Sequence, residues 1–316
     1  MMAFSQKKSP RTRWALCCTL VAICLLLPPA ISLAGDSIKV AFIGKMNSKN
    51  QQKLVTQTQQ QLQNRAITLV VDTYATDTFF NTRQNESSYD LIVTVGNRAA
   101  SLLEERTTET PTISTFTSSM AYKEKPSPHH TAIFIDQPAA RYLALIKEIL
   151  PYSRTVSLLY SDYSEPFYQQ LKQAATTQQL TINGKKVSAT SDIYNALDNA
   201  VKNSDVLLAI PDPTIYNRHT IKTIFLTSYQ DEVPIIGFSR SYTKAGAISS
   251  LHSDISDISK QLAEVISYFI QNSKKLPAAS YPNYFHVSTN HKVAHSLSIP
   301  LNDPERLLQK IIAKSR

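Results

Sequence analysis

Short, continuous runs of apolar residues alternate with longer segments of helical periodicity along the chain after residue 36. The runs at 37–43 (SIKVAFI), 90–95 (DLIVTV) and 155–160 (TVSLLY) are rich in β-branched residues. Because such runs are continuous and do not alternate with polar residues, they indicate strands buried on both faces, as in parallel sheets covered by helices. The pattern therefore predicts an α/β fold built from doubly wound parallel sheets.

This rhythm occurs twice, which predicts two lobes in series. The first series has predicted strands at 37–43, 67–73, 90–95 and 112–116, and helices at 50–62 and 98–105. The second has predicted strands at 155–160, 180–187, 205–210, 233–238 and 247–251, and helices at 138–150, 166–179, 193–201 and 221–229. We expect the segment 125–137 to connect the two series, and Asp136 to cap the helix at 138–150.

A strong amphipathic helix follows the second series. Its apolar residues recur at spacings of three and four, and they are Ile255, Ile258, Leu262, Val265, Ile266 and Phe269. Asp254 precedes them as the expected N-cap. A strand at 284–288 and two short helices complete the chain, and the last helix is expected to start at Pro304 with Asp303 as its cap.

The first 34 residues predict a signal peptide and hence an exported protein. They contain four basic residues and no acid, and an apolar run at 14–27 (WALCCTLVAICLLL) follows the basic residues. The run fits a signal-peptide core and is too short for an ordinary membrane span, which disfavours the alternative of an uncleaved anchor. Small residues at 32 and 34 place the expected cleavage after Ala34.

The cysteines agree with export. All three, Cys17, Cys18 and Cys24, lie within the predicted signal peptide. The processed chain is therefore expected to have no disulfide, no thiol nucleophile and no thiolate metal site. Cys24 is a poor lipidation site, because Ile23 stands where a lipobox has a small residue. We expect a free periplasmic protein without a lipid anchor.

The charge pattern gives no sign of nucleic-acid binding. Loss of the four basic residues lowers the formal net charge from +9 to +5. The remaining lysines and arginines are scattered, without basic runs or interleaved aromatic residues. We expect no nucleic-acid partner.

No known catalytic or cofactor-binding motif that we compared with the chain has all of its residues at the required spacing. Gly44-Lys45 lacks the earlier glycine of a phosphate loop, and the six glycines form no dinucleotide-binding motif. The segment 237–241 has only half of a nucleophile elbow. His291 and His295 are four residues apart, but Lys292 stands where zinc proteases carry glutamate, so we interpret them as surface histidines. The sequence therefore predicts no enzyme, no cofactor and no metal.

The residues that follow the predicted strands are the candidates for ligand binding, because ligands of parallel α/β sheets bind beyond the carboxyl ends of the strands. These residues are 44–45, 96–97, 115–118, 161–165, 211–216 and 239–246. They are rich in Asn, Ser, Thr, Tyr and Asp, a set that suits a small polar or aromatic ligand. The alternative is that these loops are polar only because loops are solvated.

Several stretches resemble a known family in their order and spacing. They are DLIVTVGNRAA at 90–100, DVLLAIPDPTIYN at 205–217, PIIGFSRSYTKAGAISS at 234–250 and YPNYFHVSTNHKVAHSLSI at 281–299. In these stretches the chain is similar to the periplasmic substrate-binding components of ABC transporters. Some members of that family are linked to tryptophan or other aromatic amino acids.

The resemblance implies a type I periplasmic-binding-protein fold, with two doubly wound parallel-sheet lobes joined by a three-strand hinge. It assigns 35–134 and 252–283 to the first lobe, and 135–251 and 284–316 to the second. It also implies ligand contacts from both lobes, namely Gly96, Asn97, Thr117, Tyr160, Ser161, Tyr163, Asp212, Tyr216, Ser239 and Tyr242.

Two roles follow for these residues. Asp212 is expected to hold an ammonium or another donor of the ligand, and the alternative is that it caps the helix that follows it. The rings of Tyr163, Tyr216 and Tyr242 are expected to stack on a flat ligand.

The function implied is capture of a small, amino-acid-like ligand between closing lobes, with delivery to a membrane ABC permease. The alternative is a periplasmic ligand sensor that passes its closed state to a membrane receptor. We expect a monomer in either case.

Overall fold

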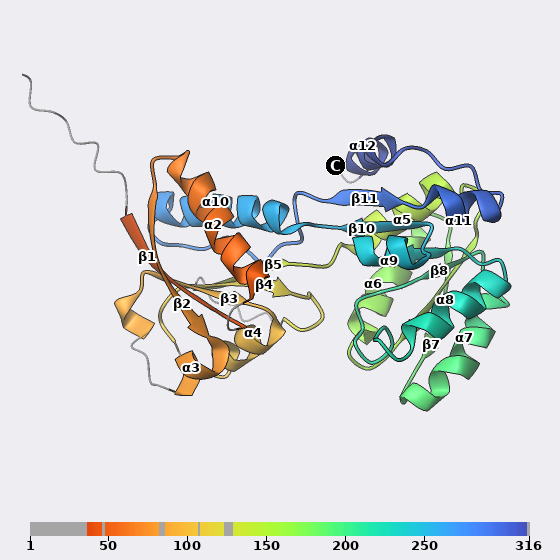
Figure 1. The fold of residues 1–316 in the computed structure, drawn as a ribbon, viewed down its shortest axis with the longest axis horizontal. Helices are drawn as coiled ribbons and strands as arrows, with labels where there is room; N and C mark the ends of the chain where they lie inside the picture. The colour runs from red at the N-terminus through yellow and green to blue at the C-terminus, as the bar shows by residue number, and fades with distance from the viewer. Residues whose placement is uncertain (1–36, 46–47, 82–85, 107, 123–128, 315–316) are drawn as a thin grey trace, which may run out of the picture. The chain divides into compact units, whose positions relative to one another are not determined.

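The computed structural model describes residues 37–45, 48–81, 86–106, 108–122 and 129–314 (Figure 1). The predicted signal peptide and its cysteines fall outside these ranges. Within them, no helix is both long and apolar enough to cross a membrane.

The first sheet has five parallel strands in the order β2-β1-β3-β4-β5. Its strands and helices are β1 (Ser37–Gly44), α2 (Lys49–Gln63), β2 (Thr68–Ala75), α3 (Thr76–Asn81), a 3-10 turn (Glu86–Ser88), β3 (Leu91–Val95), α4 (Asn97–Glu104), β4 (Thr112–Thr117) and β5 (His130–Phe134). The sequence predicted the first four strands. It assigned β5 to the connection between the lobes, because this short strand follows a long polar loop.

The second sheet has six strands in the order β11-β10-β9-β8-β6-β7, and only β11 is antiparallel to its neighbour. Its elements up to α9 are α5 (Ala139–Ile149), β6 (Thr155–Tyr160), α6 (Glu165–Thr176), β7 (Thr181–Lys186), a 3-10 turn (Thr190–Asp192), α7 (Ile193–Val201), β8 (Val206–Leu208), α8 (Ile221–Gln230), β9 (Ile235–Gly237) and α9 (Arg240–Ala245). The remaining elements of the chain are β10 (Ser249–His252), α10 (Ile255–Gln271), β11 (His286–Thr289), α11 (His291–Ser296) and α12 (Pro304–Lys314).

The first sheet is buried on both faces, as the continuous apolar runs predicted. Along β1, Val40 and Phe42 belong to one apolar cluster, whereas Ala41 and Ile43 belong to another. Since successive side chains of a strand point to opposite faces, the two clusters are the two sides of the sheet. The two-lobed α/β architecture of the prediction is confirmed.

Helix α10 returns the chain from the second sheet to the first. It starts directly after β10 of the second sheet, yet its buried residues Ile258, Leu262 and Ile266 share a cluster with β1 and α2. Figure 1 shows α10 alongside α2. Because β11 follows in the second sheet, the chain passes between the sheets three times, after β5, after β10 and before β11.

Two predicted helix caps have different outcomes. Asp254 is the N-cap of α10, as the sequence predicted. The prediction for Asp136 is wrong, because α5 has Pro138 at its N-cap. The Asp136 carboxylate accepts hydrogen bonds from the backbone nitrogen of Ser119 at 2.7 Å and from its hydroxyl at 2.5 Å. The Asp136 carboxylate is therefore hydrogen-bonded to Ser119 of a different loop and not to the N-terminus of α5.

The packing of α10 yields a prediction. Leu262→Ala should lower the free energy of unfolding by about 2–5 kcal/mol, because it leaves a cavity at a fully buried position. Gln271→Ala, at the exposed end of the same helix, should change it by no more than about 0.5 kcal/mol. Urea unfolding of both variants measures the difference, and equal effects would contradict the assigned packing.

Candidate functional site

A hollow of about 670 Å³ lies beyond the carboxyl ends of β1, β2 and β3. It is lined by residues 44–45, 75–78 and 95–99. This is the edge at which a parallel α/β sheet normally binds its ligands. Gly96 and Asn97, both predicted from the sequence, lie in this hollow.

The turn from β3 into α4 depends on Gly96. Its φ of +97° lies in the left-handed region, where a side chain would be strained. The Gly96 nitrogen donates to the carbonyl of Thr115 at 2.8 Å, and Asn97 Oδ1 accepts from the nitrogen of Ser118 at 3.2 Å. The start of α4 is thus fixed to the segment that ends β4.

Thr117 is not among the residues that line the hollow. It lies at an irregularity in the pairing of β4 with β5, next to Phe116, whose φ is +52°. Its side chain is buried, and its hydroxyl has no hydrogen-bond partner in the described part of the chain. A buried hydroxyl without a partner costs stability, so Thr117 is a candidate for contact with a bound molecule.

In the second sheet, Asp212 is the centre of a buried polar cluster. Its Oδ2 accepts from the nitrogen of Ser161 at 3.1 Å, from the Ser161 hydroxyl at 2.6 Å and from the Ser164 hydroxyl at 2.6 Å. Its Oδ1 accepts from the nitrogen of Thr214 at 2.9 Å. Asp212 is only 1% exposed. Its hydrogen bonds join the loop after β6 to the loop after β8.

Three aromatic side chains gather beside this cluster. The ring of Tyr242 lies 4.3 Å from that of Phe238 and 6.2 Å from that of Tyr216, measured between centroids. Burial raises the pKa of both tyrosines, which keeps their hydroxyls neutral. Ser239 lies between them in the sequence, as the N-cap of α9.

Tyr160 is set apart from this group. Its ring stacks on Tyr168 of α6, with centroids 4.3 Å apart and an angle of 14° between the planes. A side chain at Gly184 would collide with both rings. Tyr160 therefore packs between β7 and α6.

Loops of the two sheets meet at Tyr163. Its hydroxyl lies 2.6 Å from the hydroxyl of Ser118, which follows β4. The neighbouring Ser119 hydroxyl accepts from Tyr281 Oη at 3.3 Å, and Tyr281 Oη also lies 3.1 Å from Gln170 Oε1 of α6. The sequence did not predict that Ser119, Asp136 and Tyr281 contact one another, because no local pattern shows that distant loops meet.

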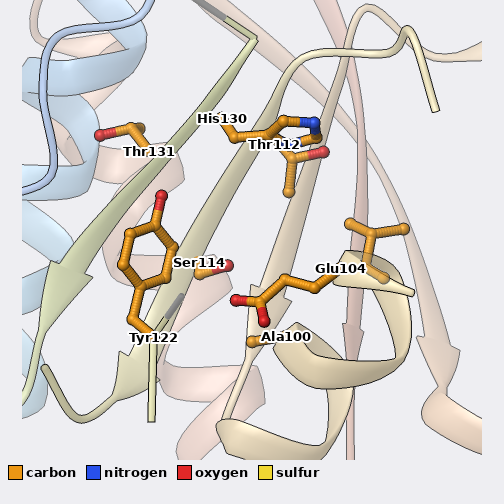
Figure 2. Close-up of a pocket in the computed structure, with 8 residues that line it drawn as sticks. Ala100, Glu104, Thr112, Ser114, Tyr122, His130 and Thr131 are labelled. Carbon is orange, nitrogen blue, oxygen red and sulfur yellow. The ribbon is translucent and has the colours of Figure 1, made fainter. Parts of the chain in front are cut away.

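A second, smaller cavity lies within the first lobe between α4, β4 and β5 (Figure 2). Glu104, Tyr122 and His130 are among its lining residues. Its volume of about 20 Å³ has room for about one water molecule. It is therefore too small to be a ligand site.

Asp136 yields a prediction on pH. Burial raises its pKa above the ordinary value, even though the Ser119 hydrogen bonds act in the opposite direction. The ionised carboxyl therefore lowers stability at neutral pH, and this cost disappears as pH falls through the raised pKa. Asp136→Asn should raise the urea midpoint at pH 7, with a smaller gain at pH 4. The control is exposed Asp231→Asn, and a gain for Asp136→Asn that is the same at both pH values would contradict the assignment.

Asp212 yields a prediction that separates its two roles. Asp212→Ala should lower the free energy of unfolding by about 3 kcal/mol, because buried donors of Ser161 and Ser164 lose their charged acceptor. Asp198→Ala, whose carboxylate pairs with Lys202 on the surface, should cost less than about 1 kcal/mol. Full stability of Asp212→Ala with loss of ligand binding would show that Asp212 serves the ligand instead.

Comparisons with known proteins agree with this architecture. Residues 76–310 match the family model described as ABC transporter substrate binding protein. No curated protein matches the chain. Among solved structures, an ABC domain from Streptococcus pneumonia in complex with L-Trp is 19% identical, with a TM-score of 0.60, over 87% of this chain and 98% of that one.

Two further solved structures share the fold. A conserved domain protein from Vibrio cholerae is 20% identical, with a TM-score of 0.61, over 86% of this chain and 98% of that one. The open, ligand-free structure of a substrate-binding protein with adhesive properties from Clostridium difficile is 15% identical, with a TM-score of 0.68, over 84% of this chain and 96% of that one. These likenesses confirm the type I periplasmic-binding-protein fold.

The family consists of substrate-binding proteins and is not an enzyme family, and a solute-binding role follows for this chain. The family model spans well over half of the sequence, from α3 to α12. The chain therefore belongs to the ABC transporter substrate-binding protein family.

Proposed function

We propose that this protein captures a small polar or aromatic solute of amino-acid type and delivers it to a membrane ABC permease. The family match supports the solute-binding part of this proposal. The observation that carries it is the pair of strand-end regions, one in each sheet, which meet where Ser118 bonds to Tyr163. A solute bound there has access to groups from both sheets.

The chemistry of the two regions supports the ligand class. The first sheet offers the amide of Asn97, and the buried hydroxyl of Thr117 has no hydrogen-bond partner among the described residues. The second offers the hydroxyl of Ser239 and the half-buried ring of Tyr242, which packs near the buried ring of Tyr216. Neutral donors and acceptors beside aromatic faces suit an amino acid with a flat side chain. The L-Trp complex of the Streptococcus pneumonia protein is in keeping with this class.

Ligand binding would shift the equilibrium between two arrangements of the lobes. A ligand held by groups from both sheets favours the arrangement in which those groups meet, by the difference in its affinity for the two states. The permease would then recognise that arrangement. No covalent step is required.

The proposal includes export. We propose that the signal peptide is removed after Ala34 and that the processed protein acts in the periplasm as a monomer. The basic residues and the apolar run of the N-terminus support this part of the proposal. Extracytoplasmic action is typical of substrate-binding proteins of ABC transporters.

A ligand screen tests the proposal. L-tryptophan, the other amino acids, aromatic metabolites and small anions are compared by thermal shift on the purified protein. A compound at 100 times its dissociation constant should stabilise the folded state by about 2.7 kcal/mol. If no compound raises the melting temperature, the binding assignment fails.

A variant then tests the site with the compound that the screen identifies. Asn97→Ala should weaken binding by about three- to tenfold, the worth of one hydrogen bond, as measured by calorimetry. Asn203→Ala, at an exposed position after α7, is the matched control and should bind as the unchanged protein does. Equal affinities of the two variants would place the ligand elsewhere.

A further inference from the structure

Three segments of the chain pass between the sheets, and we call residues 135–138, 253–254 and 280–285 the first, second and third crossings. The first crossing follows β5 of the first sheet and leads into α5. The second crossing leaves β10, and the third enters β11. Any movement of one sheet relative to the other has to bend all three crossings.

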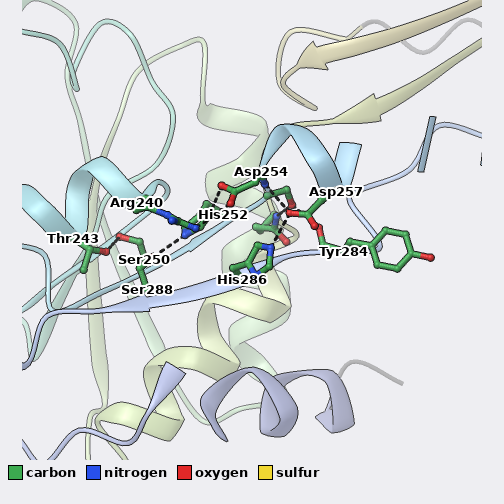
Figure 3. Close-up of polar contacts among 11 residues, drawn as sticks. Arg240, Thr243, Ser250, His252, Asp254, Asp257, Tyr284, His286 and Ser288 are labelled. Atoms are coloured by element: carbon green, nitrogen blue, oxygen red, sulfur yellow. Dashed lines mark hydrogen bonds and ion pairs between the residues drawn. The ribbon is translucent and has the colours of Figure 1, made fainter. Parts of the chain in front are cut away.

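The second and third crossings are joined where they meet the second sheet (Figure 3). His252 at the end of β10 is opposite His286 at the start of β11. His252 Nε2 lies 2.7 Å from the hydroxyl of Ser288, and His286 Nε2 lies 3.0 Å from Asp257 Oδ2 of α10. The first crossing lies outside this strand ladder, so side chains have to join it to the other two on this side.

Gln137 and Arg141 make this connection. Gln137 Nε2 donates to the hydroxyl of Ser253 in the second crossing at 3.0 Å, and its Oε1 accepts from Arg141 Nη1 at 2.8 Å. Arg141 Nη1 also donates to the carbonyl of Pro282 in the third crossing at 2.6 Å. The Ser253 hydroxyl donates in turn to the carbonyl of Tyr284 at 2.7 Å. We call Gln137, Arg141 and Ser253 the clamp.

The clamp is built into the second lobe. Gln137 is only 1% exposed, and the guanidinium carbon of Arg141 lies 4.2 Å from the centre of the Phe285 ring. Arg141 belongs to α5, whose next two residues, Tyr142 and Leu143, are fully buried in the core of the second sheet. Loss of a clamp residue leaves buried donors and acceptors without partners, which is costly in a site from which water is excluded.

Residues next to the clamp are fixed to the first lobe instead. In the first crossing, Asp136 is hydrogen-bonded to Ser119. In the second, Asp254 is the N-cap of α10, which packs on the first sheet. In the third, the nitrogen of Asn283 donates to Oε1 of Gln261 in α10 at 2.8 Å. Each crossing therefore changes from one lobe to the other within one or two residues.

The peptide group between Pro282 and Asn283 shows this change most directly. Its carbonyl accepts from Arg141 of the second lobe, and its N–H donates to Gln261 of α10. Gln261 Nε2 also donates to the hydroxyl of Ser280 at 3.1 Å, and Ser280 pairs with β5 of the first sheet. One peptide plane is thus held from both lobes.

We infer that the clamp positions the two lobes for solute capture, because it holds the three crossings to the second sheet and leaves only short links free to bend. These links lie between 136 and 137, between 253 and 254, and within 282–284. Hinges of this kind absorb a domain movement in a few backbone angles. The inference rests on the proposed function, since capture between the lobes requires such a movement.

Loss of the clamp would let the three crossings move independently. The lobes of the free protein would then adopt more arrangements, and a smaller fraction would have both strand-end regions placed for a solute. The apparent dissociation constant rises as the inverse of that fraction. Gln137 and Arg141 are therefore positioning residues that affect affinity without a contact to the solute.

Amide hydrogen exchange of the solute-free protein, read by mass spectrometry, tests the clamp. Gln137→Met has a side chain of similar volume but lacks both hydrogen bonds. Exchange should be about three- to tenfold faster in peptides that cover 250–256 and 280–289, far from the substitution in sequence. Gln173→Met on exposed α6 is the matched control and should leave these peptides unchanged. Unchanged exchange in Gln137→Met, or equal acceleration in Gln173→Met, would overturn the inference.

Two further variants separate positioning from general stability. Leu307→Ala, at a fully buried position of α12, should lower the melting temperature without faster exchange in the same peptides. If circular dichroism shows Gln137→Met to be unfolded, Arg141→Lys replaces it, because a lysine lacks the fork that reaches two acceptors. Acceleration in Leu307→Ala that equals that of the clamp variant would show a merely structural role.

The effect on capture is measured with the compound that the ligand screen identifies. Gln137→Met should raise its dissociation constant at least about threefold, whereas Leu307→Ala should leave it unchanged. Faster exchange with unchanged affinity would overturn the role in capture. The exchange measurement uses no solute, so its failure leaves the proposed transport function untouched, and a failed ligand screen leaves the exchange result standing.

Discussion

Helix α10 buries its apolar face in the core of the first sheet, although the strands before and after it in the chain belong to the second. Ile258, Leu262, Ile266 and Phe269 are fully buried in this core. Burial of four such side chains is favourable by several kcal/mol, which is enough to require that the chain leave one sheet and return to it. The two crossings that flank α10, after β10 and before β11, follow from this packing.

The strand-end regions combine groups that hold the protein together with groups that are open to a ligand. Asp212 accepts four hydrogen bonds from its own loops, and Asp136 binds both donors of Ser119. These carboxylates set the shape of the loops. In the proposed function, recognition is left to neutral groups and aromatic rings, such as Asn97 and Tyr242. A site of this kind selects ligands by shape and hydrogen bonding more than by charge.

The candidate site could be predicted only in part. Gly96 and Asn97 were found because they follow a clear apolar strand, and they lie in the hollow beyond β3. Tyr160 satisfied the same rule, yet it stacks on Tyr168. For Asp212 the sequence left a ligand contact and a helix cap open. The helix cap is wrong, because Thr220 is the N-cap of α8 and Asp212 instead joins two loops, and the ligand contact stays a prediction. Position after a strand identifies the edge of the sheet, but the direction of a side chain depends on packing partners that are far away in the sequence.

By itself, the sequence determined the class of the fold, the positions of most strands and helices, and the cap of α10 at Asp254, because these follow from local periodicity and local hydrogen bonding. It did not reveal β5, the contact of Ser118 with Tyr163, or the hydrogen bonds that join Gln137 and Arg141 to Ser253 and Pro282. Those features depend on strand pairing and on loops brought together over long sequence separations. Only the tertiary structure could decide them, since no local pattern records which distant segment will supply the partner.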